Sequence, residues 1–429
     1  MKKLLLFTLL SGVYAQDMSA QSLFNKIADK VAQSASRKVE KKLDKPSSGR
    51  STDDAAASGE DVSEDRSTPS NGDEVKSAEE SGSKTKLESR TKFDFVPGDK
   101  VVLWEDFSQE NIGEFPSKWF TRSKAETVTL NTAPGKWMKM YPGGFLSPTV
   151  DMKENYTVEF DMIMDWPVKG GFLVPSFGVS FYDRGVKNHV FSYDYTLENH
   201  MSFYIAPYRS EAYVTMSSRE NRSPKFNSDK VKVASFDQRS GKVVHVSISV
   251  QKERVRMWLD EEKVFDIPTA APYPGNLNQL KVEMNESNYT SEQIGYYVSN
   301  IKVATGSSDL KTKLETDGKV STTGIRFDTN SDNIRNESYG TINELVKVIK
   351  ANPEMKIRIV GHTDNVGSAP DNLILSKKRA DAVVKLLVES YQVPAGQLQA
   401  DGKGSTASVA DNKTAEGRAS NRRVEFIKM

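Results

Sequence analysis

The sequence predicts a multidomain protein in which an all-β antiparallel sandwich precedes a smaller α+β domain. Apolar and polar residues alternate along several segments between residues 93 and 303, as in strands with one buried face. After residue 324, strand-like segments alternate with segments of helical periodicity. That order predicts helices on one face of a mixed sheet. Before both domains, residues 46–92 contain almost no large apolar side chain.

The amino-acid composition excludes several classes of function and of site. The chain of 429 residues has 59 basic and 58 acidic side chains, so no net field favours nucleic acid or an anionic membrane. It has no cysteine, which excludes disulfides, thiolate metal sites and a cysteine nucleophile. Its four histidines lack the i,i+4 spacing of a helical zinc pair. We therefore expect neither a metal nor another cofactor.

The N-terminus has the pattern of a secretory signal peptide. Lys2 and Lys3 precede an apolar run from Leu4 to Tyr14, which predicts a signal peptide over residues 1–15 and export of the protein. The run is too short to span a bilayer, and no later apolar run is longer. We therefore expect no transmembrane segment in the mature chain.

Two segments precede the sandwich. Residues 16–45 repeat apolar side chains at intervals of four among lysines, which predicts an amphipathic helix. This helix could dock on a partner or membrane surface, or it could be a partly formed helix in a solvated tail. Residues 46–92 cannot bury enough apolar surface to offset the entropy of ordering. They are predicted to form a disordered linker.

The sandwich is predicted over residues 93–305. Its pattern resembles that of concanavalin A-like jelly-roll domains in three places, namely Trp104-Glu105-Asp106-Phe107, the strand at 156–161 and the hairpin at 245–268. The resemblance implies a jelly roll. It also raises an enzymatic alternative, because some members of that fold cleave glycans with acids along one strand.

Acidic residues do recur on one predicted strand. Glu159, Asp161 and Asp165 share one face of it. Retaining glycosidases need two carboxyl groups about 5–5.5 Å apart. Here the third acid is Asp where the pattern requires Glu, and no separate general acid is evident. We expect Val158 and Phe160 to face the core, the acids to face water, and the domain to lack enzymatic activity.

A short polar linker is predicted over residues 306–323, followed by the last domain at 324–429. The expected elements of that domain are a strand at Ile325 and Phe327, a helix around 342–349, a strand from Met355 to Val360, a helix to about Tyr391, a polar loop, and a strand from Val424 to Ile427.

The candidate site follows the second of these strands. Gly361-His362-Thr363-Asp364-Asn365-Val366-Gly367 places a carboxylate at the strand exit, and Arg379 lies in the helix beyond. An acid and a base held across a loop suit a ligand that carries both charges. The alternative is that Asp364 and Arg379 pair with each other at the surface, where such a pair contributes little.

This last segment closely resembles the OmpA-like C-terminal domain, the peptidoglycan-binding module of OmpA, Pal and MotB proteins. The motifs that carry the resemblance are Phe327-Asp328-x-Asn330, Gly361-His362-Thr363-Asp364-x-x-Gly367, Asn372-x-x-Leu375-Ser376-x-x-Arg379-Ala380, and Asn421-Arg422-Arg423-Val424. The resemblance implies binding of the peptidoglycan stem peptide, mainly its diaminopimelate residue. That residue presents an ammonium and a carboxylate on one carbon.

The ammonium would bind Asp364, and the carboxylate would accept two parallel hydrogen bonds from Arg379. The family pattern also implies ligand-binding residues at Asn330, Thr363 and Asn372, with Arg422 and Arg423 in support. His362 is expected to be structural.

These expectations describe an exported, non-enzymatic protein in the periplasm, associated with the outer membrane of a Gram-negative cell. It would link peptidoglycan to another envelope component, a glycan or a protein, held by the sandwich. The alternative function is a carbohydrate-binding or glycan-cleaving sandwich that the last domain anchors to the cell wall.

Overall fold

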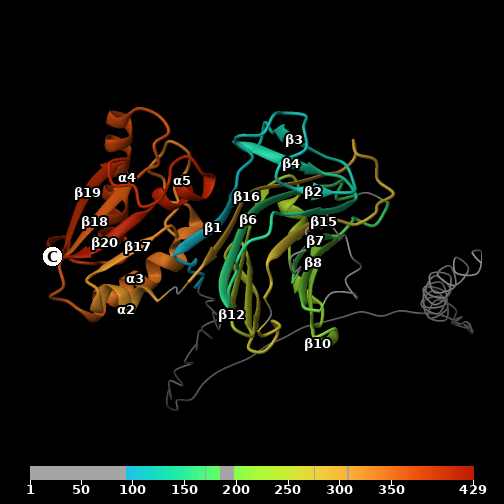
Figure 1. Ribbon diagram of the computed structural model, residues 1–429, viewed down its shortest axis with the longest axis horizontal. Coiled ribbons are helices and arrows are strands. Elements are labelled where there is room, and N and C mark those ends of the chain that lie inside the picture. Colours follow the sequence, from blue (N-terminus) through green and yellow to red (C-terminus); the bar gives the residue numbers. More distant parts are fainter. Residues whose placement is uncertain (1–92, 170, 184–197, 275, 307–308) are drawn as a thin grey trace, which may run out of the picture. The chain divides into compact units, whose positions relative to one another are not determined.

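The computed structural model describes residues 93–169, 171–183, 198–274, 276–306 and 309–429 (Figure 1). The predicted signal peptide, amphipathic helix and disordered linker lie outside these residues. We call strands β1 to β16 the β domain and residues 309–429 the C-terminal domain. Both belong to one compact unit of the chain. Within the described ranges, no helix combines the length and apolarity needed to cross a membrane.

One eight-stranded sheet of the β domain runs in the order β14-β13-β12-β6-β16-β4-β3, and β1 pairs with β16. Every pairing in it is antiparallel. Its strands are β1 (Lys100–Glu105), β3 (Ala125–Thr129), β4 (Lys136–Met140), β6 (Asn155–Asp165), β12 (Val243–Gln251), β13 (Arg254–Leu259), β14 (Glu262–Ile267) and β16 (Gly295–Thr305).

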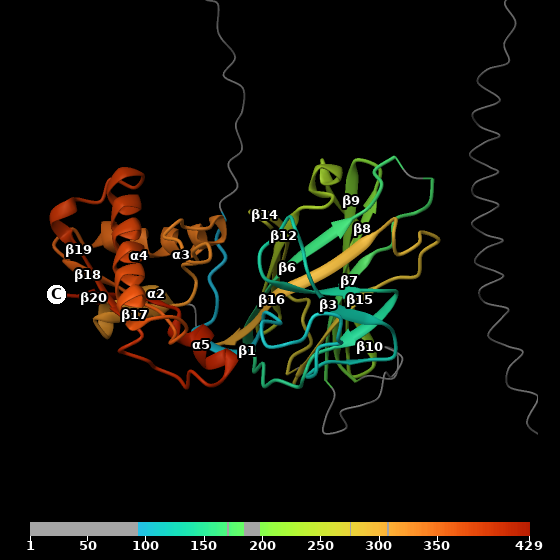
Figure 2. The ribbon, with the colours of Figure 1, turned by 90° about the horizontal axis from the view of Figure 1, so that it is seen from above.

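A second eight-stranded sheet runs in the order β10-β9-β8-β7-β15-β5-β2, and β11 pairs with β9. It is also antiparallel throughout. Its strands are β2 (Phe120–Thr121), β5 (Gly143–Leu146), β7 (Phe177–Tyr182), β8 (His200–Tyr208), β9 (Glu211–Glu220), β10 (Ser223–Asn227), β11 (Val231–Val233) and β15 (Gln279–Met284), and a short 3-10 helix, η2 (Phe236–Arg239), follows β11. The two sheets form separate layers (Figure 2).

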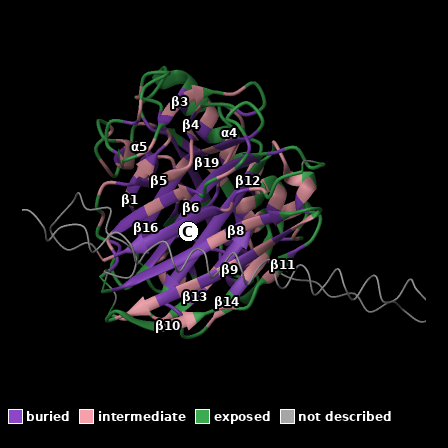
Figure 3. Cartoon of the chain, turned by 90° about the vertical axis from the view of Figure 1, so that its right-hand side faces the viewer, coloured by how far each residue is buried: buried purple, intermediate pink, exposed green. Residues whose placement is uncertain are grey.

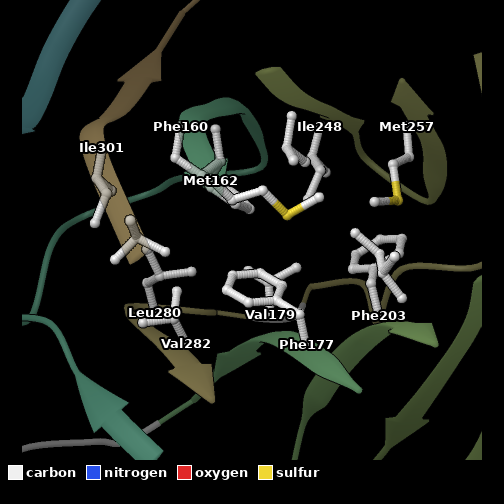
Figure 4. Close-up of a cluster of buried hydrophobic side chains, with 14 of the residues drawn as sticks. Phe160, Met162, Phe177, Val179, Phe203, Ile248, Met257, Leu280, Val282 and Ile301 are labelled. Atoms are coloured by element: carbon white, nitrogen blue, oxygen red, sulfur yellow. The ribbon is translucent and has the colours of Figure 1, made fainter. Parts of the chain in front are cut away.

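A single hydrophobic core joins the two sheets. Phe160 and Met162 of β6 point toward Phe177 and Val179 of β7 (Figure 4). This is the alternation that the sequence predicted, with every second residue of β6 in the core. Burial of each such side chain contributes about 1.5–3 kcal/mol. The antiparallel all-β prediction is confirmed for these strands, whereas the jelly-roll assignment stays a prediction.

The prediction for the other face of β6 was wrong. Glu159 and Asp161 are only 2% and 1% exposed, and among the three acids only Asp165, the last residue of the strand, is exposed. Figure 3 shows how completely the central strands are buried. Basic side chains of the C-terminal domain cover this face of β6, as Arg335 does at Asp161. A period-two pattern shows that a strand has two different faces, but it cannot show that a second domain covers the polar one.

The C-terminal domain contains a four-stranded sheet in the order β17-β20-β18-β19. β18 and β19 are parallel and the other pairs are antiparallel, so the sheet is mixed, as predicted. Its elements are α2 (Leu310–Thr316), β17 (Lys319–Thr322), η3 (Asn336–Ser338), α3 (Tyr339–Ala351), β18 (Ile357–His362), α4 (Ala369–Glu389), η4 (Ala395–Gln397), β19 (Leu398–Gly404), α5 (Ala415–Asn421) and β20 (Val424–Lys428).

Helices α2, α3 and α4 share one core with the sheet. From β18 this core takes Ile357 and Ile359, while the residue between them, Arg358, is exposed. From β20 it takes Val424 and Phe426. The three helices therefore cover the same face of the sheet, which confirms the predicted α+β fold.

Three segments of the C-terminal half differ from the predicted ones. The predicted linker at 306–323 contains α2 and β17, because Leu314 and Val320 are buried in the C-terminal core despite their polar neighbours. The strand expected at Ile325 and Phe327 is reduced to an isolated bridge between Phe327 and Ile334. The polar loop expected after α4 contains β19 and α5.

Candidate functional site

The loop from β18 to α4 is fixed at both ends. At the strand end, the Thr363 N–H donates to the Gly404 carbonyl over 3.0 Å. At the helix start, the Ser368 hydroxyl oxygen accepts from the Asp371 N–H and caps α4. A Cβ on Gly361 would collide with the Ser376 carbonyl, so the glycine lets α4 cross directly over the end of β18. The strand exit and the helix therefore meet at a defined place.

Asp364 lies in this loop and is 8% exposed. One of its carboxylate oxygens accepts from the Val366 N–H at 3.1 Å, and the other lies 2.7 Å from Nη1 of Arg422. Asn372 donates to the Val366 carbonyl at 2.9 Å, and the Thr363 hydroxyl donates to the Asp364 carbonyl at 2.8 Å. Thr363 and Asn372 thus hold the loop that presents the Asp364 carboxylate.

Arg379 does not pair with Asp364, so the alternative of a mutual surface pair is wrong. From α4, its Nε donates to the Ser331 carbonyl at 2.9 Å and its Nη2 to the Asp328 carbonyl at 3.3 Å. The guanidinium carbon lies 5.0 Å from the centre of the Phe327 ring. Burial lowers the pKa of Arg379, and the nearby Arg422 charge lowers it further, but a guanidinium stays charged at neutral pH.

The guanidinium of Arg379 retains donor capacity for a ligand. Among the contacts of the described residues, its Nη1 has no hydrogen-bond partner, and Nη2 uses one of its two N–H groups. Asn330 belongs to the same 328–333 turn, is exposed, and has a positive φ of 54°. Arg379 therefore both anchors this turn and lines the cleft with N–H groups that have no partner among the described residues.

The two consecutive arginines before β20 have different environments. Arg422 pairs with Asp364, as described above. Arg423 is buried and lies 2.7 Å from a carboxylate oxygen of Glu425, whose other oxygen is 3.4 Å from His362. Burial would raise the pKa of Glu425, but His362, Lys319 and Arg423 lower it below its usual range. Arg423 and His362 therefore hold strands β18 and β20 together, which agrees with the structural role expected for His362.

One cleft of about 690 Å³ collects all seven residues that the sequence singled out. They are Asn330, Thr363, Asp364, Asn372, Arg379, Arg422 and Arg423. That these residues bind a ligand stays a prediction. No group of three or more His, Cys, Asp or Glu side chains that could hold a metal occurs within the described ranges. The chemistry of the cleft is that of a carboxylate and a guanidinium presented together.

The sequence did not predict the opposite wall of the cleft. Residues of the β domain line it, among them Trp104, Asp106, Asn300 and Lys302. In the sequence, the segment around Trp104 indicated only a resemblance to a fold family. Periodicity does not indicate which loops of one domain contact another domain. A tryptophan two residues before an aspartate, in Trp104-Glu105-Asp106, was the only available signal.

Comparisons with known proteins agree with the geometry of the C-terminal domain. Residues 326–422 match the OmpA family. Outer membrane porin F of Pseudomonas aeruginosa is 44% identical over 101 residues, which cover 24% of this chain and 29% of the porin. Peptidoglycan-binding protein ArfA of Mycobacterium bovis is 40% identical over 89 residues, which cover 21% of this chain and 27% of ArfA.

A third relative is a motility protein. Motility protein B of Bacillus subtilis is 38% identical over 124 residues, which cover 28% of this chain and 48% of that protein. The chain thus spans less than half of the length of each of these three relatives. The similarity shows an OmpA-like domain at the C-terminus of this chain.

Proposed function

We propose that the C-terminal domain binds peptidoglycan non-covalently through the stem peptide, mainly through its diaminopimelate residue. The observation that carries the proposal is the shared cleft, in which Asp364 and Arg379 present opposite charges without neutralising each other. A relative with the same domain, ArfA, is a peptidoglycan-binding protein. The end of the diaminopimelate side chain carries the complementary pair, an ammonium and a carboxylate on one carbon.

Each charge of the ligand has a partner in the cleft. The ammonium would donate to the Asp364 carboxylate, which keeps lone pairs beyond those used by Arg422 and Val366. The carboxylate would accept from Nη1 and the second Nη2–H of Arg379. Each charge-assisted bond contributes about 1.5–3 kcal/mol net. After the costs of association, affinities of roughly micromolar to millimolar follow for a single stem.

A weak single site is adequate for this ligand. Peptidoglycan is a polymer with many stems, so the local concentration of ligand is high and several molecules can bind one sacculus. Relatives such as outer membrane porin F support a location in the envelope. The proposed location is the periplasm of a Gram-negative cell, in association with the outer membrane, after export by the N-terminal signal peptide.

The β domain is proposed to hold a second envelope component, a glycan or a protein, so that the chain links it to the cell wall. We propose that neither domain is an enzyme. In the β domain, Glu159 lies 2.9 Å from Lys302 and Asp161 lies 2.6 Å from His245, all four nearly fully buried. Acids in that state do not face a glycan, which supports binding over cleavage.

Co-sedimentation with purified sacculi tests the proposed function. Wild type is compared with Asp364→Ala and Arg379→Ala, and with the matched controls Asp381→Ala and Arg358→Ala. The control residues are exposed residues of the same domain that do not line the cleft. Wild type and controls should sediment with sacculi while both cleft variants stay in the supernatant. Equal sedimentation of all five proteins would sink the assignment.

A further inference from the structure

Arg422 connects the Asp364 carboxylate of the proposed binding site to the β domain. Its Nη1 lies 2.7 Å from Asp364, and its guanidinium carbon lies 4.9 Å from the centre of the Trp104 ring, at the end of β1. The Arg422 side chain remains 32% exposed. Its Nε and Nη2 have no hydrogen-bond partner among the described residues, so these donors remain for a ligand.

The indole of Trp104 is itself held in place. Its Nε1–H donates to one carboxylate oxygen of Asp106 at 3.0 Å, and the other oxygen accepts from the Ser108 N–H at 3.0 Å. Burial alone would raise the pKa of Asp106, but the hydrogen bonds from Ser108 and Trp104 and the charge of Arg422 lower it. An ionised Asp106 therefore fixes the ring and attracts the cation that packs on it.

Buried ion pairs order this wall of the β domain, and one of them reaches the C-terminal domain. Asp161 of β6 lies 3.7 Å from Arg335 and 2.6 Å from His245. Lys302, which lines the cleft, pairs with Glu159 at 2.9 Å. Buried charges that lose a partner are costly, so this network resists separation of the two domains.

Backbone packing adds to these pairs. A Cβ on Gly340 would collide with the Phe95 backbone, so α3 approaches the segment before β1 closely because residue 340 is a glycine. Helix α5, which immediately precedes Arg422, packs against β1, the strand that carries Trp104. The position of Trp104 over Arg422 is thus set by the contact between the two domains.

We infer that Trp104 is a positioning residue of the peptidoglycan site, which holds Arg422 against Asp364 so that the β domain forms part of the binding site. The inference rests on the function proposed above and deepens it. A guanidinium over an aromatic face keeps one orientation while its edge donates hydrogen bonds. Without the ring, Arg422 samples other rotamers, and the Asp364 carboxylate loses the partner that orients it toward the ligand.

Calorimetric titration of the full chain with a diaminopimelate-containing stem tripeptide tests this inference. Trp104→Ala should bind about tenfold more weakly, the scale of a partly desolvated cation–π contact. Trp104→Phe keeps an aromatic face and should stay within about threefold of wild type. Tyr208→Ala is the matched control, because it removes a ring with a similar contact, to Arg209 at 5.3 Å, that does not line the cleft.

A double-mutant cycle separates positioning from a general structural effect. If Trp104 acts through Arg422, Trp104→Ala in an Arg422→Ala background should cause no further loss of affinity. Additive losses would overturn the inference, as would wild-type affinity of Trp104→Ala. Thermal unfolding shows whether Trp104→Ala is folded. If Trp104→Ala fails to fold, Trp104→Phe provides the test instead, because loss of binding by folded Trp104→Phe would also overturn the inference.

The same titration distinguishes failure of the inference from failure of the proposed function. If Asp364→Ala and Arg379→Ala lose binding while Trp104→Ala binds as wild type, only the role of Trp104 is wrong. If wild type itself does not bind the stem tripeptide, the proposed function fails.

Discussion

The carboxylates of the C-terminal cleft and those of strand β6 differ in what surrounds them. Asp364 has one basic partner, Arg422, and lines a cleft that also contains an incompletely bonded guanidinium. Glu159 and Asp161 are at most 2% exposed and lie among basic side chains from both domains. These basic side chains are His245, Lys302, Arg326 and Arg335.

Under the proposed function, the difference separates an acid that binds a ligand from acids that hold the two domains together. Burial takes a carboxylate out of water at a large cost, which only close and complete pairing offsets. Such an acid has no capacity left for an external cation. Asp364 differs from these buried acids, because its pairing is incomplete and it lines an open cleft. The variants below test whether the two groups of acids have separate roles.

The largest expected effect is on stability, from Asp161→Ala. This change leaves His245 and Arg335 without their buried counter-charge, so we expect the free energy of unfolding to fall by about 3–5 kcal/mol. Asp364→Ala removes a partly exposed pair and should cost less than about 1 kcal/mol. Urea unfolding measures both. Equal losses in the two variants would contradict the division of roles.

The next effect is on ligand affinity, from Arg379. Arg379→Ala removes the charge-assisted hydrogen bonds to the ligand carboxylate, at about 1.5–3 kcal/mol each, so stem-peptide binding should weaken at least tenfold. Arg379→Lys should also weaken binding, by a smaller factor, because a point charge cannot donate two parallel bonds. Titration calorimetry measures both affinities. Wild-type affinity in Arg379→Lys would show that the two parallel hydrogen bonds of the guanidinium do not contribute to binding.

A third effect is a pH dependence of stability, from His245. Burial alone would lower the pKa of His245, but its hydrogen bond to Asp161 and the Glu159 carboxylate 3.7 Å away raise it to about 9. Because this folded-state pKa exceeds the ordinary value, the charged imidazole contributes fully below about pH 6.5. That contribution is lost as the pH rises through 9, by at most about 1.4 kcal/mol per pH unit.

His245→Gln provides the control for this pH profile. Unfolding measured between pH 6.5 and 9 should show a decline in wild type that is smaller in the variant, because the other basic groups around Glu159 and Asp161 are the same in both proteins. Parallel profiles for wild type and His245→Gln would show that the imidazole is neutral in the folded protein.

The sequence predicted that Asp364 and Arg379 lie near each other, because local motifs determine their positions. Asp364 and Arg379 lie on a strand exit and the following helix, so a single strand–loop–helix unit brings them to one cleft. Arg422 and Arg423 were equivalent in the sequence. Their different environments depend on the register of β20, because Arg423, just before the strand, lies on the same face as Glu425 within it. A motif alone does not give that register.

The sequence predicted the contact between the domains poorly. Alternation in β6 identified its core face but could not reveal that Arg335 and Arg326 cover Glu159 and Asp161. Strand β19 was missed because Leu398–Gly404 contains one large apolar residue, and its parallel pairing with β18 supplies the stabilisation instead. Features fixed by contacts between distant segments leave little trace in local periodicity.

The central claim is that the C-terminal cleft binds both charged groups at the end of the diaminopimelate side chain, the ammonium and the carboxylate. The most direct test is titration of the full chain with two stem tripeptides, identical except that one carries diaminopimelate and the other lysine. Lysine keeps the ammonium and lacks the carboxylate, so we expect wild type to bind its peptide at least tenfold more weakly, and Arg379→Ala to lose this preference. Equal binding of the two peptides by wild type would contradict the claim.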